Sequence, residues 1–251
     1  MTDPAELFVV PLARPHALRR LVCMPHAGSG AGYYRRWSRL LDESVELWIA
    51  QYPGRENRFD EPMISSMDVL AAEFADGVAR TEVPGRDTAL FGHSMGAAAA
   101  YEVARIMEGR GMDPAHVFVS GRPAPSADPV VPARLMSDEE IVAEGERHGG
   151  AAQEIFDDPD LRALVLPVLR NDYLLIDSYR SPDGPVLRAG VTALVGDRDL
   201  RVPVDAVRRW RDHTRGAFHM TVLEGDHFFL RPREHEVMDV LHRGLGAAVA
   251  P

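Results

Sequence analysis

Most of the chain alternates short apolar runs with longer stretches that have helical periodicity. Most of the short runs lack the alternation of apolar and polar positions that marks a half-exposed strand. Continuous apolar runs are typical of strands buried on both faces of a parallel sheet. Six runs predict strands, at residues 20–24, 46–50, 88–92, 116–120, 191–195 and 218–223.

Helices are predicted between these strands. Around residues 66–80, apolar residues recur on one helix face, and Ser65 with Asp68 has the pattern of a capping box. Further helices are predicted at about 95–109, 204–213 and 233–247. Strands that alternate with helices in this way predict βαβ units, and therefore an α/β fold with a mostly parallel central sheet flanked by helices.

The segment from about 123 to 183 departs from this rhythm because it contains no convincing strand. It begins with a proline-rich stretch and continues with a capping-box pattern at Ser137 and Glu140, a break at Gly149-Gly150, and a long helical pattern. A segment of this length is too long for a connecting loop. It therefore predicts a helical insertion.

We expect a single α/β domain over residues 1–251, with the insertion at about 123–183 forming a lid over the sheet. The alternative is a helical subdomain that only packs. A lid would use its apolar helical face to shape a chamber over the sheet, because a large exposed apolar face is otherwise unfavourable. That face consists of Leu161, Leu164, Val165, Val168 and Leu169.

The stretch LFGHSMGAAAA, residues 90–100, carries a predicted strand through Gly92-His93-Ser94-Met95-Gly96 directly into a predicted helix. Glycines two positions before and after a serine allow a strand and a helix to pack closely around a sharp turn, as in the nucleophile elbow. The serine Oγ then projects from the turn, beside the backbone N–H groups and the positive dipole end of the helix. Ser94 is therefore the candidate nucleophile.

A serine nucleophile needs a histidine base, and the base needs an orienting carboxylate. In α/β hydrolases with this elbow, the acid and then the histidine follow the serine along the chain. His227 is predicted to lie just after a strand, at the sheet edge where ligands bind. The strand at 191–195 runs into GDRD, where Asp199 is the preferred acid and Asp197 its competitor. The other late histidines fall within predicted helices or a strand: His213, His219, His235 and His242.

Two backbone amides are needed to bind the oxyanion that forms when a serine attacks a carbonyl. The amide that follows the serine belongs to Met95. The second is expected from PHAGSG, residues 25–30, which follows the strand at 20–24 in the place of an oxyanion loop, and it is assigned to Ala27. His26 and His93 are interpreted as packing residues of this loop and of the elbow.

Composition narrows the choice of partners. The chain has a net charge of −10, so a basic surface for nucleic acid is not expected. No apolar stretch is long enough to cross a bilayer, and the N-terminus lacks the pattern of a secretory signal. The one cysteine, Cys23, lies in an apolar run and is expected to be buried, and a single cysteine suits a reducing compartment. We expect a cytoplasmic monomer with neither nucleic-acid nor membrane partners.

Taken together, these motifs resemble those of the type II thioesterases, stand-alone editing enzymes that accompany polyketide synthases and nonribosomal peptide synthetases. The resemblance rests on PHAGSGAGYYRRW, QYPGRENR, FGHSMGA, MSDEE, GDRD and EGDHFFL, and it runs from about residue 20 to 240. It implies an α/β-hydrolase fold with a helical lid, and hydrolysis of acyl groups from the phosphopantetheine arm of acyl or peptidyl carrier proteins. By motif position it implies Ser94 as nucleophile, His227 as base and Asp199 as acid. Such a reaction requires no metal and no bound organic cofactor.

Three other functions compete with this interpretation. A carboxylesterase or lipase for small molecules would use the same fold, although a lipase is expected to carry a secretory signal. A hydrolase fold without activity, serving as a binding module, is disfavoured because the serine, histidine and acid are all present. A thioesterase domain from the end of a synthase is disfavoured by the initial methionine and by the lack of a carrier-like segment before it.

Overall fold

The computed structural model describes residues 4–81, 88–126, 136–147, 156–181 and 187–247. Its strands form one sheet in the order β1-β3-β2-β4-β5-β6-β7, in which β1 is antiparallel to β3 and the other neighbours are parallel. The six predicted strands and the mostly parallel sheet are confirmed, whereas the short β1 was not predicted. The strands are β1 (Phe8–Val9), β2 (Arg19–Met24), β3 (Val45–Ala50), β4 (Thr88–His93), β5 (His116–Ser120), β6 (Gly190–Gly196) and β7 (Phe218–Leu223).

The predicted helices are present and differ from the prediction at two boundaries, whereas the short α1 and the 3₁₀ helices at Ala31–Tyr33, Arg35–Arg39 and Glu56–Arg58 were not predicted. The stretch 204–213 is one α-helical segment followed by a 3₁₀ helix at Arg209–His213. The predicted capping box at Ser65 is wrong: the helix begins one residue later, and its N-cap, Ser66, makes no side-chain cap. The α-helices are α1 (Pro4–Leu7), α2 (Met67–Ala79), α3 (Met95–Gly109), α4 (Asp138–Arg147), α6 (Pro159–Ser178), α7 (Val204–Arg208) and α8 (Glu234–Leu245).

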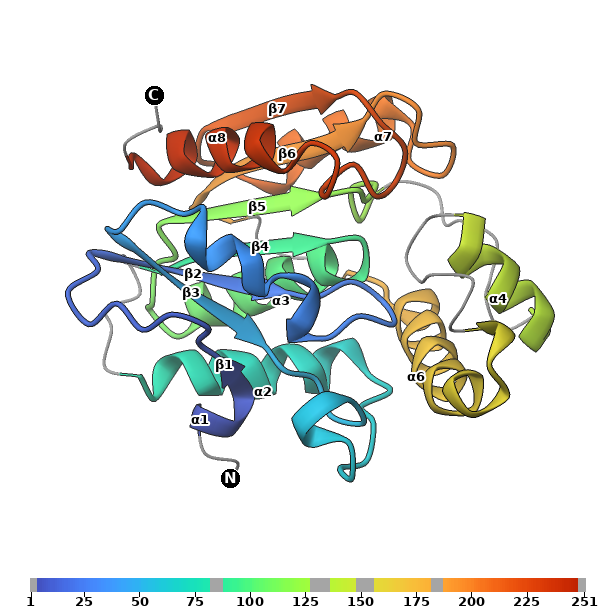
Figure 1. The fold of residues 1–251 in the computed structure, drawn as a ribbon. Helices are drawn as coiled ribbons and strands as arrows, with labels where there is room; N and C mark the ends of the chain where they lie inside the picture. The colour runs from blue at the N-terminus through green and yellow to red at the C-terminus, as the bar shows by residue number, and fades with distance from the viewer. Residues whose placement is uncertain (1–3, 82–87, 127–135, 148–155, 182–186, 248–251) are drawn as a thin grey trace.

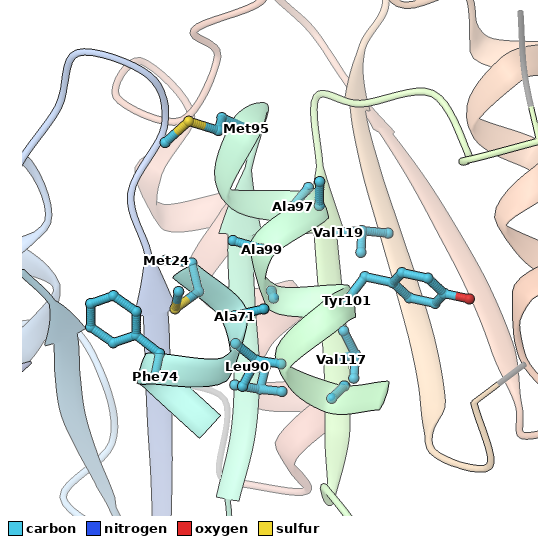
Figure 2. Close-up of a cluster of buried hydrophobic side chains, with 14 of the residues drawn as sticks. Met24, Ala71, Phe74, Leu90, Met95, Ala97, Ala99, Tyr101, Val117 and Val119 are labelled. Carbon is cyan, nitrogen blue, oxygen red and sulfur yellow. The ribbon is translucent and has the colours of Figure 1, made fainter. Parts of the chain in front are cut away.

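The sheet is covered on both faces, as its continuous apolar strands predict (Figure 1). Successive residues of one strand serve opposite layers: Leu90 packs with α2 and α3, whereas Phe91 packs with α8 and the 3₁₀ helices of residues 31–39. Figure 2 shows the alanines of α3 beside Leu90 and the valines of β5. Small side chains let α3 lie close to the sheet, and this holds the turn at the start of the helix in a fixed place.

Helices α4 and α6 lie beyond the carboxyl ends of β4 and β5 (Figure 1). Together they make up the α4–α6 segment, which comprises residues 136–147 and 156–181 and contains no strand within these described ranges. The predicted capping box is present, since Glu140 N–H donates to Ser137 Oγ at 3.2 Å and Ser137 N–H to Glu140 Oε2 at 2.7 Å. The predicted Gly149-Gly150 break lies outside the described residues.

The apolar face expected on α6 is only partly turned inward. Val168 and Leu169 are buried, but Leu161 and Leu164 are 44% and 50% exposed, so the predicted apolar face is not buried along its whole length. The buried stripe of the helix instead continues through Asp172 and Leu175. The first turns of α6 precede this buried stripe, and the periodicity of apolar residues alone cannot locate where a helix meets its neighbours.

Candidate active site

The turn between β4 and α3 has the geometry of a nucleophile elbow. Ser94 has φ 53° and ψ −116°, a conformation that is costly for any residue except glycine. A Cβ on Gly92 would lie 1.9 Å from the Gly96 carbonyl oxygen, and one on Gly96 would lie 2.0 Å from that of Met24. The turn is therefore possible only with glycine at both positions. Ser94 N–H donates to the Ser120 carbonyl at 2.8 Å, which ties the turn to β5.

Asp199 and His227 meet at the same edge of the sheet because they follow the parallel neighbours β6 and β7. His227 Nδ1 lies 2.6 Å from Asp199 Oδ2, and both side chains are buried. The other carboxylate oxygen, Oδ1, accepts hydrogen bonds from the backbone amides of Arg201 at 3.0 Å and Val202 at 3.2 Å. These amides orient the carboxylate, which in turn places the proton on Nδ1 and leaves Nε2 as the basic nitrogen of the neutral ring.

Asp197, the competing acid, has a different environment. Its side chain is half exposed, and its Oδ1 accepts from the Gly225 amide at 2.8 Å, which links the turns that follow β6 and β7. Of the two aspartates that the sequence offers, the structure thus brings Asp199 to His227 and gives Asp197 a place in turn geometry.

Two further histidines lie beside His227, and both are buried, as expected of packing residues. The ring centroids of His93 and His227 are 4.9 Å apart, and those of His26 and His93 are 5.8 Å apart. Burial lowers the pKa of His26 to about 3, helped by the charges of His227, Arg231 and Arg55. Burial also lowers the pKa of His93 well below its usual value. Both rings are therefore neutral at pH 7 and add no positive charge beside His227.

The loop after β2 forms a tight turn over residues 26–29. Ser29 N–H donates to the His26 carbonyl at 3.1 Å, and Gly28 has φ +74°, which is the conformation that the third residue of a type II turn requires. The start of α3 lies directly behind this loop, because a Cβ on Gly96 would come within 2.7 Å of the Pro25 carbonyl oxygen. The loop that carries Ala27 and the helix that begins at Met95 are therefore neighbours at the sheet edge.

A buried ion pair lies beside this turn, and the sequence interpretation missed it. Arg55 Nη1 and Nη2 donate to Asp172 Oδ2 and Oδ1 at 2.6 and 2.8 Å, and Asp172 Oδ2 also accepts from the Gly28 amide at 2.8 Å. The pair forms part of the wall of a cavity of about 10 Å³, room for about one water molecule, that Met95 and Leu175 also line. The motif QYPGRENR contains Arg55, but no sequence pattern connects it to an aspartate on α6.

The described residues contain neither a membrane-spanning helix nor a cluster of metal ligands. None of their helices combines the length and apolar character that crossing a membrane would need. The same residues include no cluster of three or more histidine, cysteine, aspartate or glutamate side chains placed to hold a metal ion. Cys23 is buried, as predicted, and burial raises the pKa of its thiol.

The sheet order, the elbow at Ser94 and the Asp199–His227 pair define an α/β hydrolase. The family model of the thioesterase domain matches residues 19–245. The chain therefore belongs to the thioesterase family and is a thioester hydrolase.

Individual relatives confirm the resemblance to type II thioesterases. The chain is 41% identical over 224 residues to thioesterase PikA5 of Streptomyces venezuelae, covering 89% of this chain and 79% of that protein. The structure of the type II thioesterase BorB, from the borrelidin biosynthetic cluster, is 36% identical with a TM-score of 0.87, over 98% of this chain and 100% of that one. YbtT, a type II thioesterase from the yersiniabactin pathway, is 29% identical with a TM-score of 0.87, over 97% of this chain and 100% of that one.

Proposed function

We propose that this chain hydrolyses acyl groups from the phosphopantetheine arm of acyl or peptidyl carrier proteins, and so frees polyketide or nonribosomal peptide synthases from wrong or stalled acyl groups. The proposal is supported by its relatives, since BorB and YbtT are described as type II thioesterases of such biosynthetic pathways. The observation that carries the chemistry is the 2.6 Å contact between Asp199 and His227 at the sheet edge. These residues follow β6 and β7, the second and third strands from β4, which runs directly into Ser94.

In the first half of the proposed reaction, Ser94 Oγ attacks the thioester carbonyl while His227 Nε2 takes its proton. The developing oxyanion accepts hydrogen bonds from the Ala27 and Met95 amides. When the carbon–sulfur bond breaks, the proton passes from His227 to the departing sulfur. The free carrier thiol leaves, and the acyl group remains as an ester on Ser94.

In the second half, a water molecule attacks the ester while His227 Nε2 accepts the water proton. Collapse of the second tetrahedral intermediate returns that proton to Ser94 Oγ and releases the carboxylic acid. Asp199 accepts the Nδ1–H of His227 throughout, and therefore stabilises the imidazolium that forms in each half.

The α4–α6 segment serves in this proposal as the lid over Ser94. The position of the two helices beyond the carboxyl ends of β4 and β5 supports it (Figure 1). A small apolar cluster of the segment, including Ile141 and Leu169, packs against Ala27 beside the elbow. A lid in this position would exclude water from the oxyanion while leaving a path for the pantetheine arm.

Replacing the nucleophile tests the proposal most directly. Ser94→Ala is expected to fold with an unchanged circular dichroism spectrum and to lose about 10⁴- to 10⁶-fold in kcat on an acyl-carrier substrate. A fluorophosphonate probe should label the wild type at Ser94 alone, as read by mass spectrometry of the digested protein. Labelling at another residue, or turnover by Ser94→Ala close to wild type, would contradict the assignment.

The substrate class is tested by comparing the same acyl group on two thiols. We expect a higher kcat/KM for the acyl group on a carrier protein than on N-acetylcysteamine, because only the carrier can contact the protein around the lid entrance. A p-nitrophenyl ester of the same acid is the third substrate. Equal values for all three would favour a general carboxylesterase instead.

A further inference from the structure

Helix α6 touches the turn at residues 26–29 with two side chains that lie one helical turn apart. Leu169 packs on Gly28 so closely that a Cβ there would lie 2.6 Å from its Cδ1 atom. Asp172 accepts the Gly28 N–H at 2.8 Å. Residues three apart share a helix face, so both contacts form or break together when the helix moves.

The Gly28 amide belongs to the central peptide of the turn, between Ala27 and Gly28. In a type II turn, the orientation of this peptide distinguishes the turn from its alternatives. The Ala27 amide is in the preceding peptide of the same turn. A hydrogen bond that fixes the central peptide therefore also limits where the Ala27 N–H can point.

Arg55 holds the Asp172 carboxylate in place. Besides its two bonds to Asp172, its Nη1 donates to the Ser29 carbonyl at 3.1 Å, so one guanidinium binds both the helix and the turn. The Arg55 backbone is itself anchored, because its carbonyl accepts from Gln51 Nε2 at 3.1 Å. Gln51 Oε1 accepts in turn from the Ala31 amide at 3.3 Å.

The guanidinium also neutralises a charge that would otherwise oppose the reaction. The side chains of Asp172 and Arg55 are 2% and 8% exposed. A lone carboxylate in this buried position would repel the oxyanion that forms beside Ala27, and little solvent is present to screen it. Paired with Arg55, Asp172 supplies a hydrogen-bond acceptor without a net negative charge.

We infer that Asp172 is a positioning residue that couples the seating of α6 to the oxyanion hole. With α6 seated, Asp172 and Arg55 hold the turn in the form that aims the Ala27 N–H at the oxyanion. With α6 displaced, the Gly28 amide loses its acceptor and the turn loses that orientation. Thioester hydrolysis is then fast only under a closed lid. The inference rests on the proposed function, because it uses the proposed roles of Ala27 and of the lid.

The test compares Asp172→Ala and Asp172→Asn with wild type on an acyl-N-acetylcysteamine thioester, a substrate that needs no carrier docking. We expect kcat to fall about 100-fold for Ala and about 10-fold for Asn, with KM changed less than about twofold. Asparagine still offers one oxygen to the Gly28 amide but turns an NH₂ group toward the Arg55 fork. If the alanine variant does not fold, the isosteric asparagine variant decides.

An alkylboronic acid gives a second readout, because its tetrahedral adduct with a serine places an oxygen in the oxyanion hole. Its inhibition constant should rise in parallel with the loss in kcat. A rise in the inhibition constant that matches the fall in kcat shows that the variant binds the transition state less well. A loss of folding stability alone does not produce this match.

Tyr179→Phe is the matched control. The Tyr179 hydroxyl, just after α6, donates to Glu102 Oε1 at 2.6 Å and so also anchors this helix through a buried carboxylate, but at its C-cap, about two turns beyond Asp172 and away from the turn at residues 26–29. We expect this variant to melt at a lower temperature while kcat and boronic-acid inhibition stay within about twofold of wild type. Equal losses of kcat in Tyr179→Phe and Asp172→Asn would overturn the inference, since any loosening of α6 would then suffice.

Wild-type kcat and inhibition in Asp172→Asn would also overturn it, whatever the melting temperature. Ser94→Ala, assayed in parallel, separates this outcome from a failure of the proposed function. If Ser94→Ala is inactive and Asp172→Asn is fully active, only the coupling between α6 and the oxyanion hole is refuted. If Ser94→Ala is active, the proposed function is refuted, and the coupling is refuted with it.

Discussion

Two buried carboxylates, Asp199 and Asp172, lie on opposite sides of the candidate site. Each accepts hydrogen bonds from backbone amides and holds one basic side chain, His227 for Asp199 and Arg55 for Asp172. The framework that positions them differs. Asp199 is in a turn between β6 and α7, and its partner follows the adjacent strand. Asp172 is on α6, and its partner is 117 residues earlier in the chain.

The two carboxylates thus differ in what determines their position: the sheet positions Asp199, whereas a neighbouring helix positions Asp172. The position of Asp199 follows from strand order, because parallel neighbours end at the same edge. The position of Asp172 depends on how α6 docks. Its carboxylate can therefore accept the backbone amide and bind its basic partner only when the helix is in place. A carboxylate at a fixed sheet edge is suited to orienting a catalytic base. A carboxylate on a docked helix is suited to making a site depend on whether that helix is in place.

The largest expected effect is a loss of kcat on replacing Asp199, the carboxylate that the sheet positions. In Asp199→Asn the side-chain oxygen keeps its bonds to the Arg201 and Val202 amides, so the NH₂ group faces His227 Nδ1. The ring is then held with its proton on Nε2 and cannot act as a base, which should lower kcat by about 10⁴-fold. Steady-state kinetics on an acyl thioester measures the loss.

Asp197→Asn is the control two residues away, and it should keep kcat within about threefold while lowering the melting temperature slightly. If Asp197→Asn is inactive and melts normally while Asp199→Asn turns over, the acid has been misassigned.

The second prediction breaks the pair at Asp172. Arg55→Met leaves a buried carboxylate without its cation and should lower the free energy of unfolding by about 3–5 kcal/mol. Arg55→Met combined with Asp172→Leu removes both charges and should recover most of that stability without recovering kcat. Urea unfolding followed by circular dichroism measures both variants.

The exposed pair of Arg110 and Asp76 gives the matched control, since both side chains are over 40% exposed. Arg110→Met should cost less than about 1 kcal/mol. An Arg55→Met variant as stable as Arg110→Met would show that the buried pair contributes no more than a surface one.

The smallest effect is a dependence of stability on pH through His26, whose pKa is lowered mainly by burial and also by the charges of His227, Arg231 and Arg55. The unfolded chain has the ordinary histidine pKa of about 6.5, against about 3 in the folded protein. Below pH 6.5 the unfolded state binds a proton that the folded state does not, so stability falls as the pH drops. The slope approaches about 1.4 kcal/mol per pH unit well below 6.5.

His26→Asn should therefore lose less stability than wild type between pH 7.5 and 5, as measured by urea unfolding at each pH. His235→Asn, at an exposed histidine, should follow the wild-type curve. Parallel curves for all three proteins would show that His26 does not contribute this dependence.

Much of this molecule was predictable because its elements have local signatures. Ser94 stands between two glycines at a strand–helix junction, and His227 follows a strand, so short stretches of sequence pointed to both. Strand β1 has only two residues and no usable periodicity, and it forms because β3 offers an edge. Asp172 was hidden for a related reason: on α6 it is one polar residue within an apolar stripe, and only its docking against Arg55 and Gly28 distinguishes it from a solvent-facing aspartate.

The strained backbone conformation of Ser94 affects what laboratory selection for heat resistance would yield. Its φ of 53° with ψ of −116° costs about 1–3 kcal/mol for a residue with a Cβ, and glycine would adopt it with little strain. Ser94→Gly is therefore expected to be more stable than Ser94→Ala, although neither has a nucleophile. A library enriched only for heat resistance will accumulate inactive chains at this position, so stabilised variants must be recovered by a screen that scores turnover.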